Sequence, residues 1–484
     1  MASIPQRPMF GWDEVESLGD LERLNLVLES LPDEELMAKL EVRRGKRGRD
    51  DYPVRAMWNA LIAGVVFQHP TVASLLRELA RNGQLRLVCG FWARRKRSLV
   101  PNAWAFSRFL ASVMKHVDLV EAMFDRLVEE IAEVLPDYGE HLAVDGKALA
   151  SYAPGRLEEH EGRQEPGRRR DSDAEWGVHA HRGTKEDGTA WEKIKSWFGY
   201  TLNLMVDTRY ELPVGFSLTK ANSSEVVEAH HLLDGVGRRH PVVVRRCESV
   251  AADRGYDDVK LISEVWEGWE ALPIIDIRNC WRDGESTKVA KGRENIVYDY
   301  RGTVSCVCLA DGTQRQMGYA GLERDRGTLK YRCPAEHYGS ECAGRELCPI
   351  GKAVRIPMEQ EPRVFTPLPR HSYKWERLYS GRTAVERVNS RLDRVFGFEN
   401  HTIRGLLKMR TRCTLALVVM LAMALGRIRA GQAEDMRSLL KSASLKHQTP
   451  QTNRRGPIQG KGPPTVSAGG RFQVTKTPRL KPAC

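Results

Sequence analysis

Residues 379–391 read Tyr-Ser-Gly-Arg-Thr-Ala-Val-Glu-Arg-Val-Asn-Ser-Arg, and this stretch decides how the rest of the chain is interpreted. Apolar residues in and after it recur every three or four positions, which predicts an amphipathic helix with one buried stripe. The stripe consists of Val385, Val388, Leu392 and Val395. Arg382, Glu386 and Asn389 fall at its margin, so the carboxylate can reach a site at the edge of the core. The same spacing is also typical of a surface helix stabilised by Arg/Glu pairs one turn apart. The upstream sequence is needed to distinguish these two interpretations.

The composition favours a partner that carries many negative charges. The chain has 484 residues, with 75 Lys and Arg against 63 Asp and Glu, a net charge of +12. That balance points to nucleic acid first, although many other proteins reach it. The ten cysteines show no disulfide framework and no signal peptide precedes them, which predicts a reducing, cytoplasmic location. The longest apolar run, Leu415–Leu425, is too short to span a bilayer and predicts a buried helix, with no membrane as partner.

The N-terminal part predicts a small helical domain with basic flanks. Residues 1–49 form an acidic lead-in that ends in a basic arm, Arg43–Arg49. Residues 50–135 predict a helical DNA-binding domain, and a second basic cluster lies at Arg94–Arg97. Three of its helices are expected to begin near Pro53, Pro70 and Pro101. A flexible linker explains the basic arm equally well, and many helical bundles bind no DNA.

From residue 136 the pattern changes to strands followed by helices, which indicates an α/β sheet. Strands are expected at 141–147, 197–207, 212–219, 241–252 and 271–277, with a helix at 225–234. The charged, glycine-rich residues 155–195 are expected to form a mobile surface loop. A Cys-rich insertion at 280–365 separates this first part, 136–279, from the helices at 366–430. The basic residues 431–484 are expected to form a disordered tail.

Three carboxylates stand out in this arrangement. Asp145 and Asp253 each sit at a predicted strand end before a glycine, and Glu386 lies on the later helix. Neighbouring strand ends can bring the two aspartates together, and a helix packed across them would add the third oxygen donor. Such a set repels itself unless cations are bound, and Mg²⁺ or Mn²⁺ suits carboxylate oxygens. Each aspartate alone is more often an ordinary turn or cap residue, so only the combination carries weight.

These motifs resemble those of bacterial insertion-sequence transposases with a DDE site. The resemblance is carried by Asp145-Gly146 after a strand, by Ala252-Asp253-Arg-Gly255-Tyr256 and by Tyr379-x2-Arg382-x3-Glu386. The segment from Gly48-Arg-Asp-Asp-Tyr-Pro53 through Arg77-Glu-Leu to Phe106-Ser-Arg108 resembles their helical N-terminal domain. Trp197-Phe-Gly-Tyr200 and Ala221-Asn222 also lie where such enzymes carry similar strands. The likeness covers roughly residues 45–430, and the Tyr-Arg-Glu signature is its most specific part.

The resemblance implies an RNase H-like mixed sheet with flanking helices, and Asp145, Asp253 and Glu386 as catalytic metal ligands. The residues expected to contact DNA or support the site are Tyr379, Arg382, Asn389, Arg391, Lys147 and Arg254. One departure concerns the family's lysine seven residues after the glutamate, because this chain has Asp393 there. Arg391 or Arg394 is then the expected substitute as a phosphate contact.

The cysteines of the insertion form a separate candidate site. Cys333-x8-Cys342-x5-Cys348, with Cys306-x-Cys308 and His337 nearby, supplies enough ligands for one structural zinc ion. The spacing differs from a double C-x2-C motif, so unrelated buried or free thiols are the alternative.

The function expected from these features is that of a DDE transposase. The partners are then the terminal repeats of a mobile element and its target DNA, held by a homodimer or higher oligomer. Two alternatives stay open: a metal-dependent nuclease on the same fold that cuts without joining, and a DNA-binding protein whose catalytic site has decayed. Metal-dependent strand transfer distinguishes the first alternative, and an intact acidic triad argues against the second.

Overall fold

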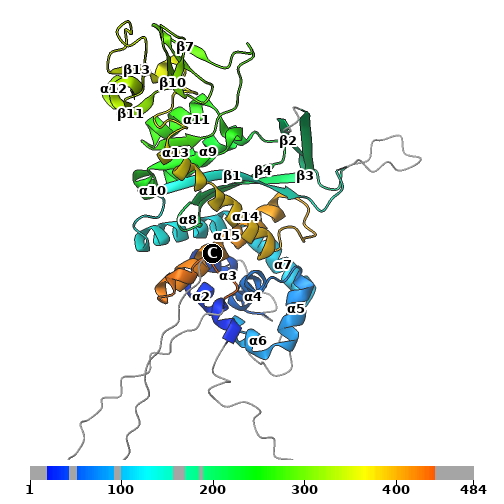
Figure 1. Ribbon diagram of the computed structural model, residues 1–484. Helices are drawn as coiled ribbons and strands as arrows, with labels where there is room; N and C mark the ends of the chain where they lie inside the picture. The colour runs from blue at the N-terminus through cyan, green and yellow to red at the C-terminus, as the bar shows by residue number, and fades with distance from the viewer. Residues whose placement is uncertain (1–18, 43–51, 92–99, 156–168, 185–188, 442–484) are drawn as a thin grey trace, which may run out of the picture. The chain divides into compact units, whose positions relative to one another are not determined.

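The computed structural model describes residues 19–42, 52–91, 100–155, 169–184 and 189–441 (Figure 1). The basic segments 43–49 and 94–97 and the tail beyond 441 lie outside the described residues. Residues 431–441, which belong to the expected disordered tail, pack against the protein instead. Within them Leu439 is buried, and the Arg437 guanidinium pairs with Glu211 at 3.0 Å.

The N-terminal part is helical, as its sequence predicts. The helices are α2 (Glu22–Ser30), α3 (Glu34–Val42), α4 (Val54–Val66), α5 (Val72–Arg81), α6 (Gly83–Cys89), α7 (Ala103–Met114) and α8 (Val117–Val134). Within α4, Met57 and Trp58 are buried. Thr71 caps α5 by accepting the amide of Ser74 at 3.1 Å, which explains why the helix starts there. Local sequence therefore determines where these helices begin.

A mixed six-stranded sheet follows. Its strands are β1 (His141–Ala150), β2 (Glu175–Thr184), β3 (Ala190–Asp207), β4 (Pro213–Lys220), β5 (Ser249–Ala252) and β6 (Leu272–Ile275). The central path runs β4-β3-β1-β5-β6, with β1 antiparallel to β3 and parallel to β5. This is the strand order of an RNase H-like fold. In Figure 1, α9 (Glu225–Arg239) lies above the sheet, and α8 and α15 (Leu406–Arg429) lie below it.

The segment between β6 and the later helices forms two small antiparallel sheets of its own. One contains β7 (Lys288–Ala290), β8 (Arg293–Tyr298), β9 (Val304–Val307) and β10 (Gln314–Gln316). The other contains β11 (Gly318–Glu323), β12 (Thr328–Arg332) and β13 (Ala353–Pro357), with the short helix α12 (Pro334–Tyr338) after β12. Around Tyr298 and Tyr331 these strands bury a separate hydrophobic cluster. The expected insertion is thus a folded unit inserted between the sheet and α13 (Tyr373–Ser380) and α14 (Thr383–Arg394).

α15 is the most deeply buried helix of the fold. It packs against α8, α2, α4 and β4, and all residues from Cys413 to Arg427 are buried. By length and composition it would be able to cross a membrane, but 89% of its apolar window is buried inside the protein. It therefore serves as the core helix that joins the N-terminal helices to the sheet. The described helices between Glu22 and Val134 share one hydrophobic core with the sheet for this reason.

Four local predictions were wrong. Residues 241–246 form the helix α10 rather than a strand, because Pro241 occupies the first helical position and His240 accepts the amides of the next turn. Part of the expected mobile loop forms β2 and the first half of β3, which pair with each other from 175 to 199. β1 continues through Asp145 to Ala150 instead of ending at the aspartate. The helix expected from Tyr379 onward is broken at Gly381, so Tyr379 lies in the last turn of α13 and α14 starts at Thr383.

Gly199 provides a test of the sheet. It lies opposite Ala150 of β1, and a Cβ there would lie 2.1 Å from the carbonyl oxygen of Leu149. We expect Gly199→Ala to lower the free energy of unfolding by at least about 2 kcal/mol, because backbone has to move. Urea unfolding followed by circular dichroism measures this. Gly237→Ala in α9 is the control, since its Cβ meets nothing closer than 3.9 Å, and an equal loss there would contradict the account.

Candidate active site

Asp145 and Asp253 lie at one edge of the sheet, where β5 ends. β1 pairs with β5 only through residues 141–143, so Asp145 extends beyond the last pair, and Asp253 directly follows β5. Burial first, and then the charge of Asp253, raises the pKa of Asp145 from 3.8 to about 7. The Asp253 carboxylate accepts the amide of Gly255 at 2.6 Å and that of Asp145 accepts the amide of Gly146 at 2.9 Å. Both side chains are therefore oriented by the glycine turns that the sequence places after them.

A further carboxylate, Glu225, lies against this pair and was not predicted. It belongs to the first turn of α9, and burial raises its pKa, while His179 lowers it and Asp253 raises it. A Cβ at Gly146 would lie 3.1 Å from one Glu225 oxygen, and a Cβ at Gly255 would lie 3.2 Å from the other. The two glycines therefore leave the space that Glu225 occupies. His179 approaches the same carboxylate at 3.3 Å. In the sequence, a glutamate at this position is an ordinary helix-start residue, so no signal marked it.

Glu386 reaches the site through Arg382. α14 packs against β1 and β3 with Val385 and Val388 buried, as the stripe predicts, and it leaves the Glu386 side chain 52% exposed. The Arg382 guanidinium binds Glu386 at 2.9 Å. Burial lowers the pKa of Arg382, but Tyr379, Glu386 and Asp145 together raise it above its ordinary value. The Arg/Glu pair of an ordinary surface helix is thus present, and its arginine also faces the aspartate.

Two buried polar atoms without hydrogen-bond partners lie on α14 or directly before it. The Asn389 side-chain oxygen, one turn after Glu386, is buried without a hydrogen-bond partner, and so is Nε of Arg382. Buried polar atoms without partners are rare and usually mark a place for water, an ion or a ligand. Tyr379 stacks on Trp375 with ring centroids 4.6 Å apart, which fixes the C-terminal end of α13 beside this place.

The donor set fits a divalent cation. Carboxylate oxygens are the ligands that Mg²⁺ and Mn²⁺ prefer. The oxygens of Asp145, Asp253 and Glu386 do not all lie within 4.8 Å of one another in the described part of the chain. Within the described residues the three carboxylates are therefore not gathered around one point.

The position where the family pattern has lysine is filled from another element. Asp393 accepts a hydrogen bond from Lys147 of β1 at 2.6 Å, and the Lys147 side chain is only 11% exposed. A positively charged side chain, Lys147, is therefore present beside position 393. It belongs to the strand that carries Asp145 and not to the helix. The pair also joins that strand to the helix that carries Glu386.

The remaining expected site residues differ in their surroundings. Arg391 is 15% exposed and binds Glu211, and burial lowers its pKa to about 10 despite that carboxylate. Its charge is thus already engaged inside the fold. Arg254 is 70% exposed beside Asp276, and Arg394 is exposed without an ion pair to any described residue. Of the two candidate phosphate contacts, Arg394 is the accessible one.

Another group of possible metal ligands, Glu140, His141 and Glu248, lies at the opposite end of β1 and β5. His141 is the first residue of β1 and is bonded to Ser249, so this group is separate from the Asp145 edge. Two of its side chains are half-buried and Glu248 is exposed, and exposed acidic groups are common without an ion, so we assign it no role.

Fold and site together define an RNase H-like protein with an acidic site at the sheet edge. Comparison with family models adds that residues 141–422, more than half of the chain, match the transposase DDE domain. Residues 13–112 match a transposase domain (DUF772). The chain therefore belongs to the DDE transposases of insertion sequences.

The chain was also compared with curated proteins and with solved structures. No curated protein matches the chain. Among solved structures, it is similar to a piggyBac transposase in a cryo-EM structure of a synaptic complex with hairpin DNA. The identity is 10% and the TM-score is 0.38, over 89% of this chain and 81% of that one.

The raised pKa of Asp145 predicts a pH-dependent stability. Because the folded-state pKa of about 7 exceeds the ordinary 3.8, this carboxyl stabilises the fold fully below pH 3.8, and the contribution is lost as pH rises through 7. Asp145→Asn should therefore be more stable than the unmodified protein at pH 8 without added divalent cation, by at most about 4 kcal/mol. The difference should shrink at pH 5.

Thermal unfolding at both pH values measures this difference. Added Mg²⁺ should raise the midpoint of the unmodified protein at pH 8 but not that of Asp145→Asn, because bound ligand stabilises the folded state. Asp234→Asn, at a carboxylate 54% exposed on α9, should change neither result. A variant at position 145 that is less stable at pH 8 would contradict the buried-charge account.

Proposed function

We propose that this transposase cleaves phosphodiester bonds at the ends of a mobile DNA element and joins the 3′-OH to target DNA. Asp145, Asp253 and Glu386 would hold two divalent cations, Mg²⁺ or Mn²⁺. The observation that supports this most is the pair of neighbouring aspartates, one of which has its pKa raised to about 7. Two carboxylates that repel each other in a partly buried site destabilise the fold, and a bound cation removes that cost.

When bound, the ions would stabilise charge on the attacking and leaving oxygens of an in-line displacement. For the ions to bind, residues of the site would have to change their present protonation and ion pairing. Asp145 would release its proton, and Glu386 would give up its ion pair with Arg382 to become a ligand. Arg382 then becomes available to contact a DNA phosphate beside the acidic residues, a role for which its fork of donors is suited. Positioning and charge neutralisation carry most of such chemistry.

Glu225 takes a supporting role in this proposal. Its carboxylate lies beside Gly146 and Gly255, the turns that orient the two aspartates. His179 can balance its charge when protonated. Glu225 therefore adds negative potential at the site without belonging to the family signature, and it is the next candidate ligand if Glu386 is not one.

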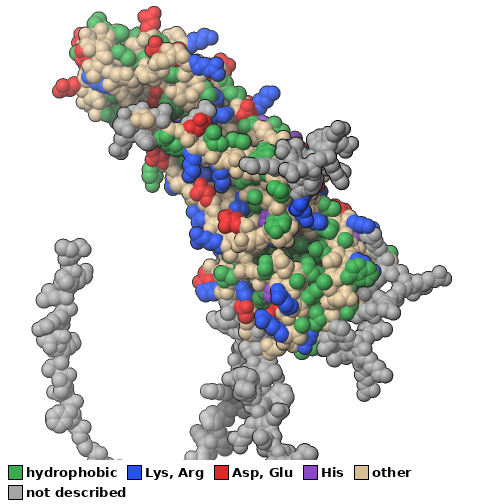
Figure 2. All heavy atoms as spheres, turned by 90° about the vertical axis from the view of Figure 1, so that its right-hand side faces the viewer, with side chains coloured by type: hydrophobic (Ala, Val, Ile, Leu, Met, Phe, Trp, Pro, Cys, Tyr) green, Lys and Arg blue, Asp and Glu red, His purple; other side chains and the backbone are tan. Residues whose placement is uncertain are grey.

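The DNA would approach along the face that carries Arg394. This residue, Lys408 and Arg412 line a cavity of about 630 Å³ between the N-terminal helices and the segment around α14 and α15. Figure 2 shows hydrophobic side chains over the lower half of one face, with Lys and Arg side chains among them. Basic side chains beside the catalytic helix suit phosphate contacts, which position DNA without reading its sequence. Holding two element ends would require at least two copies of the chain.

A nuclease that cuts without joining is the main alternative. Both reactions use the same carboxylates, so only the detection of joined product distinguishes them. A decayed catalytic site is disfavoured, because all three acidic residues of the signature are present and two of them lie beside each other.

The test of the site is Glu386→Gln. The change keeps the size of the side chain and leaves the buried stripe untouched, but it replaces an anionic oxygen with a neutral amide. We expect Mg²⁺-dependent nicking and strand transfer on a duplex with the element's terminal repeat to fall by about a hundredfold or more, with folding and DNA binding retained. Glu376→Gln, at an exposed position of α13, is the matched control and should keep activity. Near-full activity of Glu386→Gln would move the catalytic glutamate elsewhere, and Glu225→Gln would then be tested.

Arg394 tests the DNA-binding face. We expect Arg394→Gln to weaken binding of terminal-repeat DNA and to reduce the slope of log affinity against log salt by about one, because one phosphate contact is lost. Fluorescence anisotropy at several salt concentrations measures both quantities. Arg238→Gln, at a side chain 71% exposed on α9, is the control for general loss of charge. Equal effects of the two variants would show that Arg394 makes no specific contact.

A further inference from the structure

The insertion has a small core for its length. Its two sheets bury one cluster of side chains that includes Ile296, Leu329 and Val354. The sheets have three and four short strands, and β7 and β10 have only three residues each. A core this small gains stability from an added cross-link such as a disulfide or a bound metal. Its cysteines, Cys280 to Cys348, are all unpaired in the structure, which leaves the metal as the candidate.

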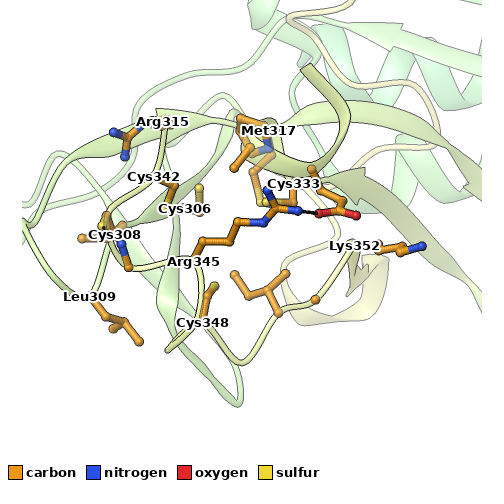
Figure 3. A pocket seen from close by; sticks show the side chains of 17 residues that line it. Cys306, Cys308, Leu309, Arg315, Met317, Cys333, Cys342, Arg345, Cys348 and Lys352 are labelled. Carbon is orange, nitrogen blue, oxygen red and sulfur yellow. Dashed lines mark hydrogen bonds and ion pairs between the residues drawn. The ribbon is translucent and has the colours of Figure 1, made fainter. Parts of the chain in front are cut away.

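Five of these cysteines line one cavity of about 260 Å³ (Figure 3). Cys306 lies on β9 and Cys308 directly after it, in the first sheet. Cys333 follows β12, and Cys342 and Cys348 lie in the segment between α12 and β13, in the second sheet. The cavity therefore brings together thiols from both sheets. His337, which the sequence also suggested as a ligand, does not line it.

Two of the sulfurs already accept hydrogen bonds from N–H groups. The amide of Gly344 donates to Cys308 at 3.3 Å, and the side-chain amide of the buried Asn295 donates to Cys348 at 3.5 Å. The Gly344 backbone comes so near that a Cβ there would lie 3.0 Å from the Cys308 sulfur. Donors of this kind stabilise metal-bound thiolates and orient them.

Most of the charges around the cavity are those that thiolates require, although the Asp311 carboxylate is hydrogen-bonded to the Cys308 thiol. Arg315, Arg345 and Lys352 line it, against one carboxylate, Glu336, which is paired with Arg345. Nη1 of Arg315 is buried and has no hydrogen-bond partner. Four thiolates around a divalent cation carry a net charge of −2, so cationic neighbours stabilise the assembly.

We propose that four of these five cysteines bind one structural zinc ion that joins the two sheets of the insertion. Zinc is favoured because it takes four thiolates in a closed tetrahedral site, with no position left for substrate. Among the described residues no three of the sulfurs lie within 4.8 Å of one another, whereas a closed site requires about 3.8 Å. Binding therefore draws the segment with Cys342 and Cys348 toward β9 and releases the thiol protons to solvent.

The test uses the full chain, expressed with zinc and purified without chelator. Elemental analysis should give about one zinc per chain and no matching amount of iron. Of the five single Cys→Ser variants at the cavity, four should lose most of the zinc. Cys280→Ser, at an exposed thiol outside the cavity, should keep it. Zinc-free protein, iron in place of zinc, or full zinc in all five variants would each overturn the proposal.

A second measurement covers variants that fail to fold. In the unmodified protein, Co²⁺ exchanged for zinc should show the strong visible absorption of tetrahedral thiolate ligation, and excess Mg²⁺ should not displace it. Cobalt spectra of octahedral oxygen ligation would place the ion at another site and contradict the assignment. Because neither readout uses DNA, failure here leaves the proposed transposition chemistry unaffected.

Discussion

An apolar helix that has to be covered on every side organises this protein. α15 is 24 residues long and almost without polar side chains in its middle, so any exposed face would be a large hydrophobic surface. The sheet covers one side through β4, and α2, α4 and α8 cover others. The N-terminal helices are therefore part of the same core as the catalytic sheet, whatever further role they have. Because α14 leads into α15, the helix with Glu386 is held at a well-packed position.

The acidic residues of the site, in contrast, destabilise the fold. The parallel pairing of β1 and β5 brings Asp145 beside Asp253, and the start of α9 adds Glu225. Without cations the fold tolerates them by keeping Asp145 partly protonated and by placing Arg382 near it. Sites of this kind commonly store instability that function requires. Here the stored instability is electrostatic, because burial and the neighbouring Asp253 both disfavour the charged form of Asp145.

The sequence alone predicted those features that depend on local pattern. The stripe of α14, the start of α5 near Pro70 and the change from helices to an α/β sheet follow from periodicity and turn residues. α10 was missed because a run of valines favours a strand, whereas the proline before it and the tertiary setting favour a helix. β2 was missed because its charged, glycine-rich surroundings resemble a loop, and its partner β3 lies further along the chain. Glu225 was missed for a different reason: only the spatial approach of two glycines from other segments gives it meaning. The cysteine spacing suggested one shared site for the five thiols, but not that they come from the segments of two different sheets.

The ion pair between Lys147 and Asp393 makes two distant positions of the gene dependent on each other. With Lys147 only 11% exposed, a lysine at 393 would place two ammonium groups together with little water between them. Changing Lys147 alone would instead leave Asp393 without its partner. Either substitution alone would give a less stable protein, whereas exchanging the residues at both positions would restore an ion pair. Divergence at these positions is therefore epistatic, and a signature built on the helix alone would misjudge relatives that carry the cation on the strand.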